Sequence, residues 1–495
     1  MIKILALLLL LLAACGRAPQ TRTVGAGVNP FPAVFEPEPM PMQREIPSFN
    51  RYTVMLEVDP SARAVQGLSQ IEYTNRTDIA LDTLVMRIYL NAFGQGHIPP
   101  VFSGQRASVF VHGSEYARMD VQNVAVNGES TAFELEGTVL TITPSQPINP
   151  NQTVQISLQF DADIPMIAHR TGANEYAMWM GKFLPVMALA TDEGWHVEPY
   201  YAAGDPFLLE AAHFDVSITT PIGYTVAGTG TKMERIMEDT VITRFTANMS
   251  RDFAFAISSS FNTAHTTTQS GTVVHLYYYT DYLDVDMILE AARLAMEYYE
   301  DRVGAFPYRQ ISIVEVDLFV RARAFSQVVF VDSDALYSGR FSSLSHQLAR
   351  QWFPLVVATD PFVESWLAGG LSQYMYASFT RRSEAELAWH MERDHSNALE
   401  HPEITIANAL GTYATWQAYA TANYNLASLM MHALALRMGM EEFWAFINAF
   451  YREYSFGIAS GTDFIRMAQE AYGEPLDAFF EAWLWSDVLP PLRVE

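Results

Sequence analysis

The sequence predicts an α+β multidomain protein, in which an N-terminal antiparallel β-sandwich or saddle domain is followed by a mainly helical domain. Three observations support this prediction. Short segments of alternating polar and apolar residues occupy the chain from Asn50 to about Phe261. Strand and helix patterns mix after about Val273, and beyond Ser345 the apolar residues recur at helical spacing. The predicted boundaries are 47–262 for the β domain and 263–489 for the second domain.

The chain begins MIKILALLLLLLAACGRAPQ, which has the pattern of a bacterial lipoprotein signal peptide. Its apolar run, 4–12, is too short to span a bilayer comfortably, and it leads into Leu-Ala-Ala-Cys, which resembles a lipobox. We therefore expect residues 1–14 to be the signal peptide and Cys15 to carry the lipid. The Pro- and Gly-rich residues 15–46 predict a flexible tether. The alternative is a secreted protein with a chance cysteine near its cleavage site.

This signal predicts a protein of the bacterial cell envelope, lipid-anchored on the extracytoplasmic side of a membrane. The sequence shows no later segment that resembles a transmembrane helix, so we expect a soluble body. Cys15 is the only cysteine, which leaves no disulfide framework and no thiolate metal site. The formal net charge of −25 argues against nucleic acid as a partner, because no basic stripe exists that could bind phosphates.

Alternation of polar and apolar residues predicts the strands of the first domain, and turn residues such as Asp59-Pro60 separate them. The predicted strands are 51–59, 69–73, 84–90, 139–143, 153–160 and 214–220.

The second domain starts with strand patterns and continues with helical ones. The predicted strands are 274–279, 306–316 and 325–332, and a helix is expected over 285–303. Seven further helices are predicted over 345–357, 364–379, 384–399, 423–438, 441–454, 461–472 and 476–486.

The segment 345–376, SHQLARQWFPLVVATDPFVESWLAGGLSQYMY, predicts two helices joined by a loop. Its phrases HQLARQWFP and WLAGGLSQY resemble the HELAHQWFG and WLNEGFASY motifs of the aminopeptidase N-type zinc metallopeptidases (M1 family, gluzincin clan), with the same spacing between them. The β-rich part resembles the same peptidases in EYTNRTDIALDTLVMRIYLNAF and WHVEPYYAAGDPFLLEAAHFDVSI. The resemblance implies a thermolysin-like peptidase fold for the helical domain.

The zinc-binding positions of that family carry other residues here. In the family, HExxH supplies two histidine ligands and a glutamate base, and a glutamate nineteen residues later is the third ligand. The matching residues are His346, Gln347, Arg350 and Gly369. Arginine stays protonated and offers only donors, glycine has no side chain, and glutamine cannot take a proton from water. His346 is therefore the only surviving ligand position.

Two further positions follow from the resemblance. Ala324 stands where the family has the glutamate that holds the substrate's amine, and Tyr424 matches the tyrosine that stabilises the oxyanion. His390, His395 and His401 do not rebuild a metal site, because 390 and 395 are five residues apart and face apart on a helix.

We therefore expect a degenerate site with no zinc or other cofactor, in a pseudopeptidase that binds a peptide or carboxylate ligand or acts as a scaffold. One alternative is an active zinc metallo-aminopeptidase with non-standard ligands, and another is an envelope protein whose cleft is filled.

We expect an arginine to supply part of the positive charge that the zinc ion supplies in the family. Arg350 lies one turn after His346, so both side chains point from one helical face toward the position of the metal. A buried arginine needs a partner. Two partners are open: Glu364, the nearest acidic candidate, in an internal pair, or a ligand carboxylate held bidentately. The candidate ligand-binding residues are Arg350, Tyr424, Arg321 and Arg323.

Overall fold

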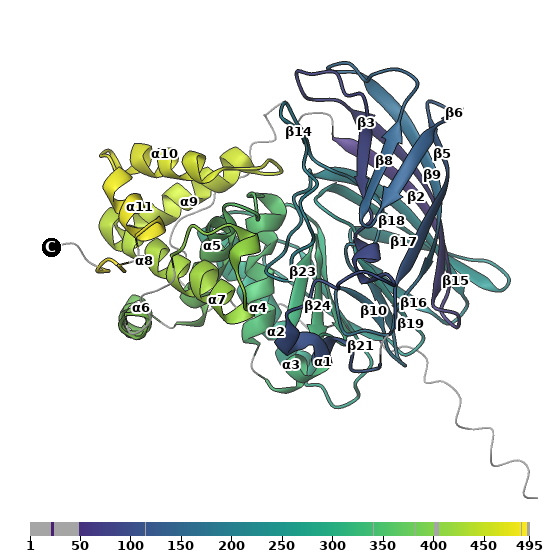
Figure 1. Ribbon diagram of the computed structural model, residues 1–495. Coiled ribbons are helices and arrows are strands. Elements are labelled where there is room, and N and C mark those ends of the chain that lie inside the picture. The colour runs from purple at the N-terminus through teal and green to yellow at the C-terminus, as the bar shows by residue number, and fades with distance from the viewer. Residues whose placement is uncertain are drawn as a thin grey trace, which may run out of the picture.

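The computed structural model describes residues 21–23, 49–113, 115–339, 341–381, 383–399, 405–486 and 488–492. A β-rich half and a helix-rich half lie side by side (Figure 1). Within the described ranges, no helix has both the length and the apolar character needed to cross a membrane. The predicted signal peptide, Cys15 and nearly all of the predicted tether lie outside these ranges. The boundary predicted at residue 262 stays a prediction.

A large sheet of the β-rich half runs in the order β17-β18-β15-β2-β3-β9-β5-β6. β2 and β15 pair in parallel, and the other neighbours in this order are antiparallel. Burial alternates residue by residue along β2, as expected for a strand with one face on a core. The strands are β2 (Asn50–Asp59), β3 (Ala64–Thr74), β5 (Arg118–Val126), β6 (Glu129–Ser130), β9 (Thr153–Asp163), β15 (Ala212–Pro221), β17 (Thr231–Ile236) and β18 (Thr240–Ser250).

This half also has two smaller four-stranded sheets, with the orders β12-β4-β8-β7 and β10-β11-β19-β16, and a pair of two-residue strands, β13 (Ala190–Thr191) and β14 (Gly194–Trp195). Side chains of the large sheet and of both smaller sheets share one core, which gives the predicted sandwich-like packing. The predicted strand 84–90 is too long, because the chain turns into a 3₁₀-helix at Tyr89–Phe93. The strands are β4 (Leu84–Arg87), β7 (Ala132–Glu136), β8 (Val139–Thr143), β10 (Thr171–Ala173), β11 (Met178–Met180), β12 (Val186–Met187), β16 (Thr225–Gly228) and β19 (Phe255–Ser258).

A mixed sheet begins the second half, in the order β1-β20-β21-β22-β24-β23. β21, β22 and β24 are parallel, and β23 pairs antiparallel with β24 at the end of the sheet. The predicted strand 325–332 starts too early. A tight turn at Ser326 and Gln327, where Gln327 has a φ of 59°, separates Phe325, the last residue of β23, from β24, which covers the rest of the predicted range. The strands are β1 (Thr21–Thr23), β20 (Asn262–Thr267), β21 (Val273–Tyr278), β22 (Gln310–Val316), β23 (Ala322–Phe325) and β24 (Val328–Asp332).

In the helix-rich half, the predicted helices agree closely with the sequence periodicity, two of them differ in detail, and the short helices α3 and α7 were not predicted. The predicted helix 345–357 begins earlier, and its second half is the π-helical turn η3 (Gln351–Val356). The predicted helix 423–438 begins in another π-helical turn, η5 (Thr421–Leu426). The helices are α2 (Val285–Arg302), α3 (Ser333–Tyr337), α4 (Ser342–Ala349), α5 (Ser365–Thr380), α6 (Glu384–Ala398), α7 (Trp416–Ala420), α8 (Ala427–Met438), α9 (Met440–Tyr454), α10 (Gly461–Tyr472) and α11 (Asp477–Leu484).

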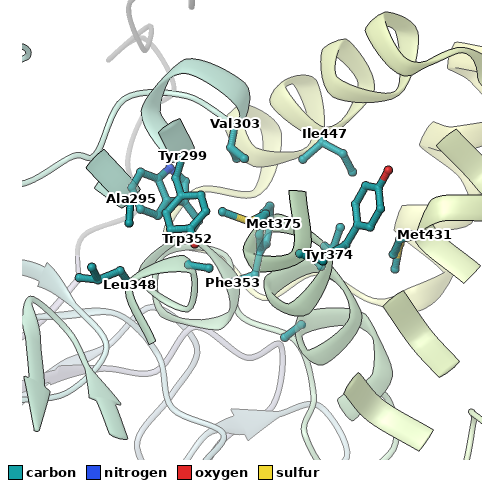
Figure 2. Close-up of a cluster of buried hydrophobic side chains, with 14 of the residues drawn as sticks. Ala295, Tyr299, Val303, Leu348, Trp352, Phe353, Tyr374, Met375, Met431 and Ile447 are labelled. Carbon is teal, nitrogen blue, oxygen red and sulfur yellow. The ribbon is translucent and has the colours of Figure 1, made fainter. Parts of the chain in front are cut away.

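The core of the helical half fixes α4 and α5 (Figure 2). Trp352 is fully buried, its Nε1 donates to the carbonyl oxygen of Gly304 at 2.8 Å, and its ring packs edge-to-face on Tyr299. Tyr374 of α5 stacks on Trp444 of α9 in the same core. The apolar side chains of this helix pair therefore form the face that packs, and the opposite face of α4 is left for the cleft.

Candidate functional site

A cleft with a volume of about 500 Å³ lies between the edge strand β23, helices α4 and α5, and the α7–η5 segment. Its lining includes side chains from these elements and from the segment just before β23, among them Arg321, Arg323, His346, Gln347, Gln373, Trp416 and Tyr424. A second, small cavity of about 50 Å³ is lined by Ala324, Arg350, Gly369 and Asp205, among others. The fold thus gathers every residue singled out at the family's catalytic positions, but it divides them between two cavities.

His346 is held as a neutral imidazole. Its Nδ1 lies 2.7 Å from Oε1 of Gln373, and its ring packs edge-to-face on Tyr424. Burial lowers the pKa of His346 to about 3, and the nearby Arg350 guanidinium acts in the same direction. With Nδ1–H donated to the Gln373 oxygen, Nε2 is the acceptor nitrogen of the ring.

Arg350 ends α4 and is buried. Its Nη2 donates to Oδ2 of Asp205 at 2.7 Å. The predicted Arg350–Glu364 pair is therefore wrong. Glu364 instead accepts a hydrogen bond of 2.8 Å from the backbone N–H of Gly461, at the N-terminus of α10, where a carboxylate is favoured.

Asp205 joins two arginines. Its Oδ1 accepts from Nη2 of Arg170 at 2.6 Å, while its Oδ2 accepts from Arg350. Burial by itself would raise the pKa of Asp205, but the guanidinium groups of Arg170, Arg350 and Arg323 outweigh it and hold the pKa well below its usual range. Asp205 is thus ionised, and both of its oxygens are engaged.

Arg323 differs from the other two buried arginines. It is 5% exposed, and its guanidinium lies over the Trp416 ring at 5.7 Å. Its Nε is buried without a hydrogen-bond partner, and no ion pair joins Arg323 to a carboxylate of the described residues. Arg321, two residues earlier on the same side of the chain, is exposed at the rim of the cleft.

The residues at the family's zinc positions do not fit a zinc ion. Arg350 places a permanent cation at the second ligand position. A Cβ added to Gly369 would lie 2.4 Å from the carbonyl oxygen of Asn423, so the η5 backbone stands where a third ligand's side chain would begin. Within the described ranges, no cluster of three or more His, Cys, Asp or Glu side chains is arranged to hold a metal.

The other histidines do not come together as a substitute. Nε2 of His395 lies 2.7 Å from the carbonyl oxygen of Pro490, and His390 lies near Glu386 on α6. His401 lies outside the described residues.

The sequence reasoning missed Asp205, Arg170, Gln373 and Trp416. Asp205 and Arg350 are separated by 145 residues, and nothing in the local pattern around GDPFLL marks the aspartate as a partner of α4. A search for carboxylates able to neutralise a buried arginine would have included Asp205 only as one of many acidic residues.

Part of this chain is similar to known peptidases. Residues 326–483 match the peptidase family M1 domain. Aminopeptidase N of Streptomyces lividans is 22% identical over 239 residues, which are 43% of this chain and 28% of that protein. Probable aminopeptidase 2 of Sulfurisphaera tokodaii is 22% identical over 231 residues, which are 42% of this chain and 29% of that protein. The match thus spans less than a third of the length of these curated relatives.

Solved structures match over most of the chain. The M1 zinc metallopeptidase of Deinococcus radiodurans superposes with a TM-score of 0.69 at 16% identity, covering 90% of this chain and 95% of that one. A mutant of the same enzyme bound to a Tyr-Ser-Ala substrate gives the same TM-score at 15% identity, with 90% of this chain and 96% of that one covered. At this identity the likeness establishes a shared two-domain fold.

Proposed function

We propose that the protein, whose residues 326–483 match the peptidase family M1 domain, is a pseudopeptidase related to aminopeptidase N, which binds a peptide or small ligand in its cleft without hydrolysing it.

The ion pair between Arg350 and Asp205 is the observation that supports this proposal. A hydrolytic zinc site needs three protein ligands and an open position for water, with a base to take the water's proton. The second ligand position is occupied by a guanidinium that is already neutralised, and Gln347 stands at the position of the base. His346 alone does not hold a catalytic metal.

The size of the cleft favours ligand binding over a filled, purely structural site. Its volume of about 500 Å³ lies within the range typical of small-molecule pockets, roughly 300–1,000 Å³. A ligand that binds the folded state raises its melting temperature, so ligand-induced stabilisation distinguishes these two functions.

Metal analysis combined with an activity assay tests the proposal. The purified protein is incubated with zinc, dialysed, and assayed on aminoacyl fluorophores, with the Deinococcus radiodurans metallopeptidase as the active control. We expect far less than one zinc per chain and no chelator-sensitive hydrolysis. Near-equimolar zinc that survives dialysis, together with chelator-sensitive hydrolysis, would favour the active aminopeptidase with non-standard ligands.

We also propose that the protein acts at a membrane of the bacterial cell envelope, anchored on the extracytoplasmic side through a lipid on Cys15. The Leu-Ala-Ala-Cys run after the apolar segment supports this. In cells fed an alkyne fatty acid, the parent protein should be labelled and processed, whereas Cys15→Ser should remain an unlabelled precursor. Normal labelling of the variant would contradict the anchor.

A further inference from the structure

The cleft contains a buried cation whose charge is not balanced. Three buried guanidinium groups, those of Arg170, Arg323 and Arg350, interact with one carboxylate, that of Asp205. Both oxygens of Asp205 are taken by Arg170 and Arg350, which leaves Arg323 without an ion pair among the residues that the structure describes. A buried charge without a partner is costly, so a group that pairs with Arg323 is favoured.

We propose that Arg323 is the centre of an anion-binding subsite that holds the carboxylate of a ligand in the cleft. This inference rests on the proposed ligand-binding function and names the chemistry of the ligand. Arg350 is already paired with Asp205, so the ligand carboxylate contacts Arg323 in its place.

The composition of the cleft wall supports an anion and disfavours an amine. Its described lining includes two arginines, Arg321 and Arg323, and neither aspartate nor glutamate. His346 adds no negative charge, and it stays neutral because burial lowers its pKa. On a chain with a formal net charge of −25, this wall is a local region of opposite sign, which draws anions into the cleft.

The setting of Arg323 prepares it to bind. The indole of Trp416 lies under the guanidinium at 5.7 Å, which orients the planar fork before a ligand arrives. Such a fork matches the two oxygens of a carboxylate, and a preoriented one loses less freedom on binding. Burial, helped by the Arg170 guanidinium, lowers the pKa of Arg323, which is the electrostatic mark of a cation without its anion.

The shape of the cleft favours a ligand longer than a small acid. A third cavity, of about 330 Å³, shares Gln373, Tyr376 and Asn425 with the cleft, so this cavity and the cleft adjoin along α5. A peptide with its carboxylate on Arg323 has room to extend past Gln373 and Tyr376, which offer amide and hydroxyl groups to its backbone. We therefore assign the subsite to the carboxylate of a peptide.

Isothermal titration of the protein with three probes tests this assignment: N-acetyl-trialanine with a free carboxylate, the same peptide as its C-terminal amide, and succinate. We expect the free acid to bind and the amide to bind at least about tenfold more weakly, because the charge-assisted hydrogen bonds are lost. Tighter binding of the peptide acid than of succinate would support a peptide ligand, and equal binding of the two would assign the same subsite to small organic acids.

Arg323→Met is the informative variant, and Arg235→Met, at an exposed arginine of β17 away from the cleft, is its matched control. Arg323→Met should weaken binding of the acid by about 10- to 100-fold and leave the amide unchanged, whereas Arg235→Met should change either affinity less than about threefold. Arg323→Lys, which keeps the charge and loses the fork, should give an intermediate affinity, and circular dichroism checks the fold of each variant.

Equal binding of acid and amide by the parent protein, no binding of the acid, or undiminished binding of the acid by a folded Arg323→Met would overturn the subsite. These outcomes are distinct from failure of the pseudopeptidase function, which shows itself as zinc retention and hydrolysis. A peptide that binds equally as acid and amide would leave ligand binding standing while removing Arg323 from it.

Discussion

Helix α4 and the turn that follows it have two faces of opposite kind. The inner face carries Leu348, Trp352 and Phe353 into the core of the helical half, where each is fully buried among apolar side chains (Figure 2). The other face, called the cleft face below, carries His346 at the cleft and Arg350 at the small cavity, each held by a specific polar partner from another element. Because the inner face packs against this core, we expect its apolar side chains to contribute most to holding the helix in place.

Removing a large side chain from the inner face should give the largest effect. Trp352→Ala should lower the free energy of unfolding by about 3–5 kcal/mol, because it leaves a cavity and an unpaired Gly304 carbonyl oxygen. Urea unfolding measures this. Trp389→Ala, at a side chain that is 58% exposed on α6, should stay within about 0.5 kcal/mol of the parent. Similar losses in the two variants would show that the inner face is not what fixes α4.

On the cleft face, Asp205→Asn should cost about 3 kcal/mol, because it leaves buried arginines without their carboxylate. Arg350→Met should cost less, about 1 kcal/mol, since Arg170 still pairs with Asp205. Chemical denaturation at pH 7 compares the two variants. A larger loss for Arg350→Met would mean that Arg170 does not compensate the carboxylate.

The apolar packing of the inner face could be predicted from the sequence more fully than the polar contacts of the cleft face. The helices of the second half follow from apolar spacing, because that signal is local and each helix buries one stripe. The start of the predicted strand 325–332 was misplaced, because Ser326 and Gln327 form the β23–β24 turn without the Gly, Pro, Asn or Asp that often marks one.

The positions of His346, Gln347, Arg350 and Gly369 on facing helices were predictable, since the spacing of the two motifs carries them. The partner of Arg350 was not. Glu364 is close in sequence, but its carboxylate binds the N-terminus of α10, and the carboxylate that reaches Arg350 belongs to a loop that only the tertiary fold brings near. Local patterns give the frame of a site, while its charge pairing depends on long-range contacts.

Gly369 of α5 packs closely against η5, and adding a methyl group there tests how tightly these two segments fit. Gly369→Ala should destabilise the protein by about 1–3 kcal/mol, because the new Cβ meets the Asn423 carbonyl oxygen at 2.4 Å. The gain of about 1 kcal/mol from replacing a helical glycine does not offset a clash with backbone. Gly104→Ala, at a position with no atom within 4 Å of the added Cβ, should be near neutral. Thermal unfolding compares the two variants. A higher melting temperature for Gly369→Ala would show that the η5 backbone shifts at little cost in free energy.

The close approach of the Asn423 carbonyl oxygen to Gly369 should also prevent zinc binding when the family's ligand residues are introduced. A triple variant with Gln347→Glu, Arg350→His and Gly369→Glu has the family's ligand residues in sequence, but the third of them begins against the η5 backbone. We expect it to retain less than one tightly bound zinc per chain after dialysis. Stoichiometric zinc in a folded triple variant would show that the η5 backbone moves to admit the new side chain at position 369.

The smallest expected effect is a pH dependence that belongs to the cleft face. In the unfolded chain a histidine binds a proton below about pH 6.5, whereas burial holds the pKa of His346 in the folded protein at about 3. Between these values the unfolded state binds more protons, so stability contributed by neutral His346 is complete above pH 6.5 and is lost as the pH falls toward 3. His346→Gln should remove about 1 kcal/mol of the stability difference between pH 6.5 and 5, measured as the slope of unfolding free energy against pH. At pH 8 the two proteins should differ only by the lost hydrogen bond to Gln373. Parallel curves for parent and variant would mean that His346 titrates alike in both states, and that the cleft face of α4 is as well solvated as a surface.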